Sequence, residues 1–174
     1  MSKKKETNIF IIEDNKLFTL ALKADIEATF TKTPIRIHSF ETGEASMDLF
    51  KEVKPEIVIL DYHLNSKHPD AADGIKILDW IKNEDEETNV IMLTSDDNID
   101  VAVKSLHHGA ADYVVKSETK FKKINYSLRN LIKMREARSE AKLYKRLAIG
   151  MFLCIAVLAC GIIVVQIFMP ALIR

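Results

Sequence analysis

The 174-residue sequence predicts a doubly wound parallel α/β sheet with helices on both faces, followed by a basic helical stretch and an apolar C-terminal segment. Four short apolar runs, rich in β-branched residues, alternate with amphipathic stretches, at residues 9–12, 57–60, 90–93 and 113–115. Apolar runs of this length between helical patterns are typical of buried parallel strands. The spacing of the runs therefore predicts the fold class.

Polar side chains stand directly after each of these runs. Glu13 and Asp14 follow the first run, Asp61 the second, Thr94 the third and Lys116 the fourth. In open parallel sheets, ligands bind outside the carboxyl ends of the strands. The spacing therefore predicts that three carboxylates, one hydroxyl and one ammonium gather at a single edge of the sheet.

The chemistry of this set indicates a magnesium-dependent phosphoryl site. Crowded carboxylates resist ionisation unless a cation joins them, and oxygen ligands without His or Cys suit Mg²⁺. An Asp can act as a nucleophile and form an acyl phosphate, while Thr and Lys donate hydrogen bonds to phosphate oxygens. Any one position could hold an ordinary polar residue at a strand end. The five together, in strand-end register, favour the functional interpretation.

On the basis of these five strand-end residues, residues 7–130 resemble a response-regulator receiver domain. The resemblance implies a flavodoxin-like fold with five parallel strands, in which Asp61 accepts a phosphoryl group from a phosphohistidine. It also implies that Mg²⁺ is the cofactor, held by Glu13, Asp14, Asp61 and the backbone carbonyl of His63.

The same resemblance assigns the remaining site residues. Thr94 and Lys116 match the positions that contact the phosphoryl group, and Tyr113 matches the aromatic switch residue of the family. Residues 40–45 are similar to the family's entry into its second helix, and residues 73–74 to its entry into the third.

Two features depart from the family pattern. The loop between Asp61 and Asp73 is longer than usual, and its role is not predicted. Lys116 is followed by Ser117 where the family commonly has Pro, so the geometry of that bond is not predicted either, because a cis bond before Ser costs several kcal/mol more. Four of the five histidines are considered as zinc or phosphorelay residues, but they lack zinc-site spacing and their side chains are interpreted as surface residues: His63, His68, His107 and His108.

Charge divides the chain into three parts although the formal total is zero. Residues 1–117 carry 22 acidic and 14 basic side chains, a net charge of −8. Residues 118–147 carry 3 acidic and 10 basic side chains, a net charge of +7, and residues 147–173 carry no charge.

The apolar segment at residues 147–169 predicts one transmembrane helix, because about 20 apolar residues span the hydrocarbon core. A buried helix of a soluble protein is the alternative, but such helices usually carry a polar stripe. Lys142, Lys145 and Arg146 precede the segment and only Arg174 follows it. The positive-inside rule therefore predicts a single-pass protein of the cytoplasmic (inner) membrane, with the receiver facing the cytoplasm.

The predicted organisation is a basic N-terminal tail at residues 1–6, the receiver, a basic juxtamembrane helical connector at residues 131–146, the membrane helix, and a short far-side tail at residues 170–174. The connector's lysines and arginines are better explained by anionic membrane lipid than by nucleic acid, because no second helix forms a helix-turn-helix. Small residues at four-residue spacing within the membrane segment leave a homodimer open.

We therefore expect a membrane-anchored response regulator without enzymatic or DNA-binding output. It would catalyse only its own phosphotransfer and dephosphorylation, with a sensor histidine kinase or phosphotransfer protein as donor and a downstream protein as target. The alternative is a membrane scaffold that docks a signalling partner, either unphosphorylated or acting as a phosphate sink.

Overall fold

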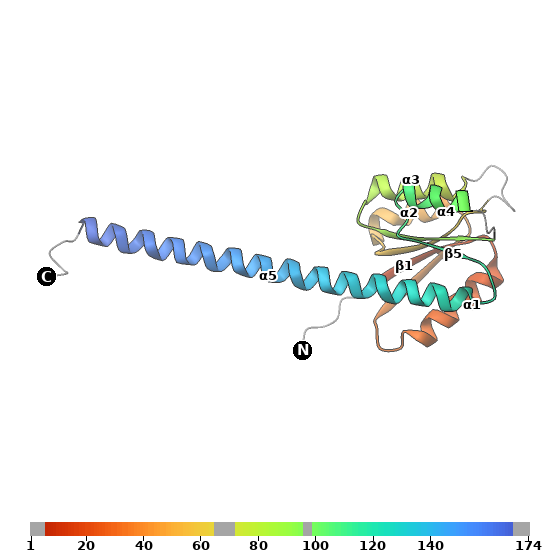
Figure 1. Ribbon diagram of the computed structural model, residues 1–174, viewed down its shortest axis with the longest axis horizontal. Coiled ribbons are helices and arrows are strands. Elements are labelled where there is room, and N and C mark those ends of the chain that lie inside the picture. Colours follow the sequence, from red (N-terminus) through yellow and green to blue (C-terminus); the bar gives the residue numbers. More distant parts are fainter. Residues whose placement is uncertain (1–5, 65–71, 96–98, 169–174) are drawn as a thin grey trace. The chain divides into compact units, whose positions relative to one another are not determined.

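The computed structural model describes residues 6–64, 72–95 and 99–168 (Figure 1). Five parallel strands form one sheet in the order β2-β1-β3-β4-β5, which confirms the predicted five-stranded parallel α/β fold. In chain order the elements are β1 (Thr7–Ile12), α1 (Lys16–Thr29), β2 (Ile35–Phe40), α2 (Gly43–Val53), β3 (Ile57–Asp61), α3 (Gly74–Glu84), β4 (Asn89–Thr94), α4 (Ile99–His107), β5 (Asp112–Val115) and α5 (Lys120–Phe168).

The helices form a layer on each face of the sheet. Helices α2, α3 and α4 cover one face, and α1 with the first turns of α5 covers the other (Figure 1). Central strands enclosed in this way are buried on both sides, and every residue of β3 is buried. This explains why β3 is a continuous apolar run rather than an alternating one.

Strand β2 lies at the edge of the sheet and pairs only with β1 among the described strands. Its sequence is IRIHSF; Arg36 and Ser39 are exposed, the other residues are half-buried, and none is fully buried. An edge strand contacts fewer neighbours, so polar residues such as Arg36 and Ser39 are tolerated there.

Backbone hydrogen bonds continue the sheet beyond the strand ends, where the polar residues of the predicted site stand. The Glu13 N–H donates to the Phe40 carbonyl at 3.0 Å, and the Lys116 N–H donates to the Thr94 carbonyl at 2.7 Å. Asp61 is paired in register with Leu93. The ladder therefore fixes the backbone from which each of these side chains projects.

Helix α3 begins directly against the end of β3. A Cβ atom added at Gly74 would lie 2.6 Å from the Asp61 carbonyl oxygen and 2.6 Å from the Tyr62 Cα atom. The Gly74 N–H donates to the Tyr62 carbonyl at 3.0 Å, and Asp73 caps the helix by accepting from the Lys76 N–H at 2.8 Å. Only glycine permits this close approach of helix to strand.

Helix α5 extends over two compact units of the chain, residues 1–131 and residues 132–174. Within its first turns Ile124, Leu128 and Leu131 recur at helical spacing and are buried. Across the described residues, no helix combines the length and apolar character needed to cross a membrane. Met169 and the predicted far-side tail at residues 170–174 lie outside the described residues, as do residues 1–5 and residues 65–71 of the long loop.

Gly74→Ala should lower the free energy of unfolding by about 1–3 kcal/mol, because the methyl group meets backbone that cannot move aside cheaply. Urea denaturation of the full chain, followed by the fluorescence of its single tryptophan, Trp80, measures the effect. Gly150→Ala is the control, since no atom beyond the adjacent residues and the backbone of its own helix lies within 4 Å of the added Cβ. Equal transitions for the two variants would contradict the close-approach argument.

Candidate functional site

Three buried carboxylates converge at the carboxyl ends of two adjacent strands, β1 and β3. Glu13 and Asp14 follow β1, and Asp61 is the last residue of β3. Their exposed fractions are only 2%, 5% and 2%, respectively. One carboxylate oxygen from each residue lies within 4.8 Å of the other two. Three acidic groups thus share a small and poorly hydrated space.

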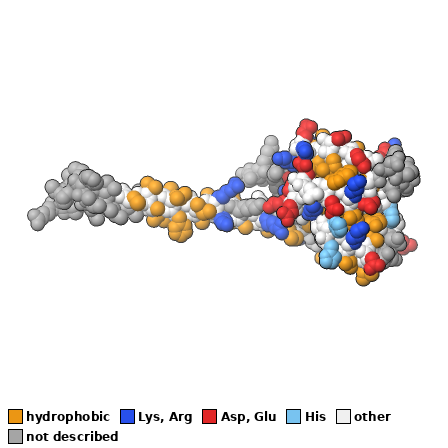
Figure 2. Space-filling model, turned by 90° about the horizontal axis from the view of Figure 1, so that it is seen from above, with side chains coloured by type: hydrophobic (Ala, Val, Ile, Leu, Met, Phe, Trp, Pro, Cys, Tyr) orange, Lys and Arg blue, Asp and Glu red, His pale blue; other side chains and the backbone are white. Residues whose placement is uncertain are grey.

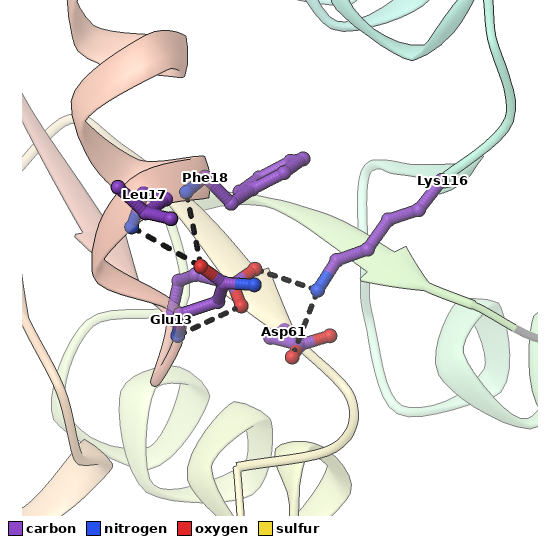
Figure 3. Close-up of polar contacts among 6 residues, drawn as sticks. Glu13, Leu17, Phe18, Asp61 and Lys116 are labelled. Atoms are coloured by element: carbon purple, nitrogen blue, oxygen red, sulfur yellow. Dashed lines mark hydrogen bonds and ion pairs between the residues drawn. The ribbon is translucent and has the colours of Figure 1, made fainter.

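The Lys116 ammonium, after β5, lies against two of these carboxylates. Its Nζ atom is 2.6 Å from Glu13 Oε2 and 2.9 Å from Asp61 Oδ2 (Figure 3). The lysine side chain is 15% exposed, so these ion pairs are largely shielded from water. Because shielding strengthens electrostatic interactions, the lysine binds both carboxylates more firmly than a surface ion pair would.

The carboxyl group of Glu13 has a raised pKa. Burial is the largest cause, the negative charge of Asp61 adds to it, and Lys116 acts in the opposite direction. The Asn15 N–H also donates to Glu13 Oε1 at 3.2 Å and favours the ionised form. The net direction shows that Lys116 and the Asn15 N–H do not offset the burial of Glu13 and the charge of Asp61.

Asn15 connects the acidic pair to the start of α1. Its Oδ1 atom accepts from the N–H groups of Leu17 and Phe18, each at 3.1 Å (Figure 3). This arrangement is an N-cap, in which a side-chain oxygen satisfies the free donors of the first helical turn. The cap fixes the position of α1 relative to the carboxylates.

The donor set fits a divalent cation of the magnesium type. Asp61 Oδ1 is buried without a hydrogen-bond partner in the described part of the chain, although its other oxygen binds Lys116. Three carboxylates with one ammonium leave an excess of negative charge, and all the clustered ligand atoms are oxygens. Mg²⁺ prefers such ligands and keeps several waters in addition.

The structure places most of the predicted site residues in the lining of one pocket, whereas Thr94 and Tyr113 lie outside that lining. A pocket at this edge is lined by Glu13, Asp14, Asn15, Phe18, Asp61, His63, Ser95 and Lys116. Thr94 ends β4 next to the pocket and is fully buried, whereas Tyr113 is half-buried and packs against the core on the α2–α4 side of the sheet. The Lys116–Ser117 peptide bond is trans.

Three of the pocket residues were not predicted from the sequence: Asn15, Phe18 and Ser95. Asn15 and Ser95 directly follow residues that were predicted, so a wider window at each strand end would have included them. Phe18 carries no polar group, and its position follows from the geometry of the helix cap rather than from any motif.

The family comparison agrees with this geometry. The model of the response regulator receiver domain family matches residues 9–126. The chain therefore belongs to the response regulator receiver domain family of two-component signalling. Receiver domains of this family interact with histidine kinases or phosphotransfer partners and typically bind Mg²⁺ through acidic residues.

Two curated relatives illustrate the sequence similarity. The probable C4-dicarboxylate response regulator DctR of Bacillus subtilis is 32% identical over 143 residues, covering 82% of this chain and 55% of the relative. The transcriptional regulatory protein AfsQ1 of Streptomyces coelicolor is 29% identical over 109 residues, covering 63% of this chain and 44% of the relative. The chain thus spans about half the length of these two relatives.

Solved structures show the same fold. The signal receiver domain of a putative Luxo repressor protein from Vibrio parahaemolyticus superposes with a TM-score of 0.68 at 24% identity, covering 79% of this chain and 98% of that one. The BeF₃-activated receiver domain of DrrB, a Thermotoga maritima protein, superposes with a TM-score of 0.62 at 25% identity, covering 74% of this chain and 99% of that one.

Glu13→Gln should stabilise the metal-free protein at neutral pH. The pKa of Glu13 is raised in the folded protein above its ordinary value of 4.5. The folded state therefore loses stability as the pH rises from 4.5 through the raised pKa, and this loss remains at higher pH. The advantage of the Gln variant should therefore vanish below pH 4.5. Thermal unfolding of the full chain in chelator, from pH 4 to 8, measures this.

The same variant should respond less to Mg²⁺. Wild type should gain about 2.7 kcal/mol when Mg²⁺ is present at 100 times its dissociation constant, and Glu13→Gln should gain less. Glu27→Gln, an exposed acid on α1, should behave as wild type in both experiments. A Gln variant that is less stable than wild type in chelator at neutral pH would refute the charge argument.

Proposed function

We propose that the chain is a phosphoacceptor protein in which Asp61 receives a phosphoryl group from the phosphohistidine of a sensor kinase or phosphotransfer protein. The observation that carries this proposal is the state of the Asp61 carboxylate at the end of the central strand. One oxygen is ion-paired with Lys116, and the other is buried with no hydrogen-bond partner among the described residues. The Asp61 carboxylate is therefore not fully engaged within the described residues, and it would act as the nucleophile.

The transfer step follows from the charges of the site. An Asp61 oxygen attacks the phosphorus atom, a new P–O bond forms, the P–N bond breaks, and the imidazole leaves with the bonding electrons and takes up a proton. Mg²⁺, when bound, would neutralise the carboxylates and the phosphoryl oxygens. Glu13, Asp14, Asp61 and the backbone carbonyl of His63 would hold it.

The other site residues would respond to the new acyl phosphate. The Lys116 ammonium lies 2.9 Å from Asp61 Oδ2, so a small shift would bring it to a phosphoryl oxygen. Thr94 is the last residue of β4, the strand beside β3, and its hydroxyl would donate a second hydrogen bond. Thr94 is paired in register with Val115 on β5, two residues after Tyr113. Movement of the Thr94 side chain would alter the packing of Tyr113 and so change the surface presented to a downstream protein.

Asp61→Asn should abolish phosphorylation of the full chain, because the amide nitrogen is no nucleophile and the site loses a metal ligand. Acetyl phosphate with Mg²⁺, followed by intact-protein mass spectrometry, should add one phosphoryl group to wild type and none to the variant. Asp79→Asn, on α3, is the matched control and should be labelled normally. Equal labelling of wild type and the Asp61 variant would contradict the assignment of Asp61 as the phosphoacceptor.

The output would be protein contact rather than chemistry or DNA binding. The chain would catalyse only its own phosphotransfer and dephosphorylation, and phosphorylation would regulate its binding to a downstream protein target. Close approach of two C-terminal segments could make a homodimer part of this output. No role in binding nucleic acid is proposed.

We further propose that residues 147–169 anchor the protein in the cytoplasmic membrane, with the receiver on the cytoplasmic side. The support is the sequence, which has no charged residue from Leu147 to Ile173. Along the part of this stretch whose side chains are described, hydrophobic side chains lie at the surface of the helix (Figure 2). Phe152 is 76% exposed and Val157 is 70% exposed. Burying them in lipid would remove this apolar surface from water. The preceding basic residues would contact anionic lipid headgroups.

The anchor predicts a defined fractionation result. The full chain should pellet with membranes and resist extraction at alkaline pH, whereas a chain ending at residue 146 should be soluble and still accept a phosphoryl group. Protease should spare the receiver in intact spheroplasts and digest it in inverted vesicles. A soluble full chain, or a receiver cut from outside, would overturn the anchor or its orientation.

A further inference from the structure

Phe18 lies beside the site lysine although it can neither bind a metal nor carry a charge. The Lys116 Nζ atom is 4.9 Å from the centroid of the Phe18 ring, within the distance of about 6 Å at which a cation and an aromatic face attract one another. Phe18 stands in the first turn of α1, is half-buried and lines the pocket together with the carboxylates (Figure 3).

A second aromatic ring supports Phe18 from the other helix on the same face of the sheet. The rings of Phe18 and Phe121 have centroids 5.6 Å apart and are inclined at 53°. Phe121 lies in the first turn of α5 and has its own cation contact, with the Lys120 ammonium 5.5 Å from its ring. Both α1 and α5 therefore fix the ring that faces the site lysine.

The ring and the carboxylates act differently on the ammonium. The carboxylates of Glu13 and Asp61 accept directed hydrogen bonds, whereas the ring attracts the cation through its negative face without a fixed acceptor atom. When a phosphoryl group joins Asp61, the ammonium has to exchange a carboxylate oxygen for a phosphoryl oxygen. A ring that covers its open side allows this exchange while it keeps water away and limits how far the lysine can swing.

We infer that Phe18 is a positioning residue, whose ring holds the Lys116 ammonium over Asp61 and is itself held by Phe121. The inference rests on the proposed phosphoacceptor function, since the lysine needs this position to meet a phosphoryl oxygen. It assigns a role in phosphoryl binding to an apolar residue of α1 and links the site to the start of α5.

The contact can be tested without any phosphoryl chemistry. Ring currents should shift the Hε resonances of Lys116 upfield in the full chain labelled with ¹³Cε-lysine, and Lys116→Arg identifies the signal by removing it. Phe18→Leu keeps the apolar bulk but loses the ring, so the shift should disappear, whereas Phe18→Tyr should retain it. An unchanged Lys116 resonance in Phe18→Leu would overturn the inference.

Beryllofluoride affinity in the presence of Mg²⁺ tests the consequence. Phe18→Leu should bind it about 3- to 30-fold more weakly, the range that a shielded cation–π contact provides, and Phe18→Tyr should restore the affinity. Phe30→Leu is the control, because Arg129 contacts the Phe30 ring at 5.7 Å on the same helix pair, away from the pocket.

The outcomes separate the two proposals. If wild type itself fails to bind beryllofluoride, the proposed function fails and the positioning role fails with it. If wild type binds and Phe18→Leu binds equally well, only the positioning role is wrong. If Phe30→Leu weakens binding as much as Phe18→Leu does, the effect is a general loosening of the interface between α1 and α5, which also refutes the inference.

Discussion

The Lys116 ammonium and the buried carboxylates of Glu13 and Asp61 form the interaction around which this end of the molecule is organised. Burying a charge costs several kcal/mol unless close partners compensate, and here a third carboxylate, Asp14, adds to the negative excess. Burial of the Glu13 carboxyl, and then the negative charge of Asp61, raise its pKa despite the Lys116 ammonium. A site built in this way favours a divalent cation. It also favours a ligand that can accept the Lys116 ammonium in place of a carboxylate.

The sheet supplies the rigidity that such a site requires. The carboxylates follow two adjacent buried strands, and Lys116 is held by a 2.7 Å backbone hydrogen bond to the end of β4. Gly74 allows α3 to begin against the Asp61 backbone. Carboxylates on mobile loops would separate to reduce their repulsion, whereas these are fixed close together by the hydrogen-bond ladder. The repulsion between the carboxylates therefore persists in the metal-free protein, and a bound cation would relieve it.

Most of the fold could be predicted because the central strands are uniformly apolar and end in polar residues. Strand β2 could not be located from its own pattern, since Arg36 and Ser39 interrupt the apolar residues of an edge strand. The carboxylates and Lys116 lie together as strand-end spacing predicts, but Phe18 approaches the lysine only through the turn that the Asn15 cap sets. Tyr113 faces the core rather than the pocket, which reflects the alternation of side chains along β5.

The central claim is that the carboxylates of Glu13, Asp14 and Asp61 hold a divalent cation because Lys116 alone does not balance them. The most direct test is the affinity of the full chain for Mg²⁺ as a function of pH, measured by calorimetry. The account predicts that affinity falls, with proton release on binding, as the pH is lowered through a pKa above the ordinary 4.5 of a glutamate, and that Glu13→Gln removes this dependence. Mg²⁺ binding that is absent, or that is independent of pH from 4.5 to 7, would contradict it.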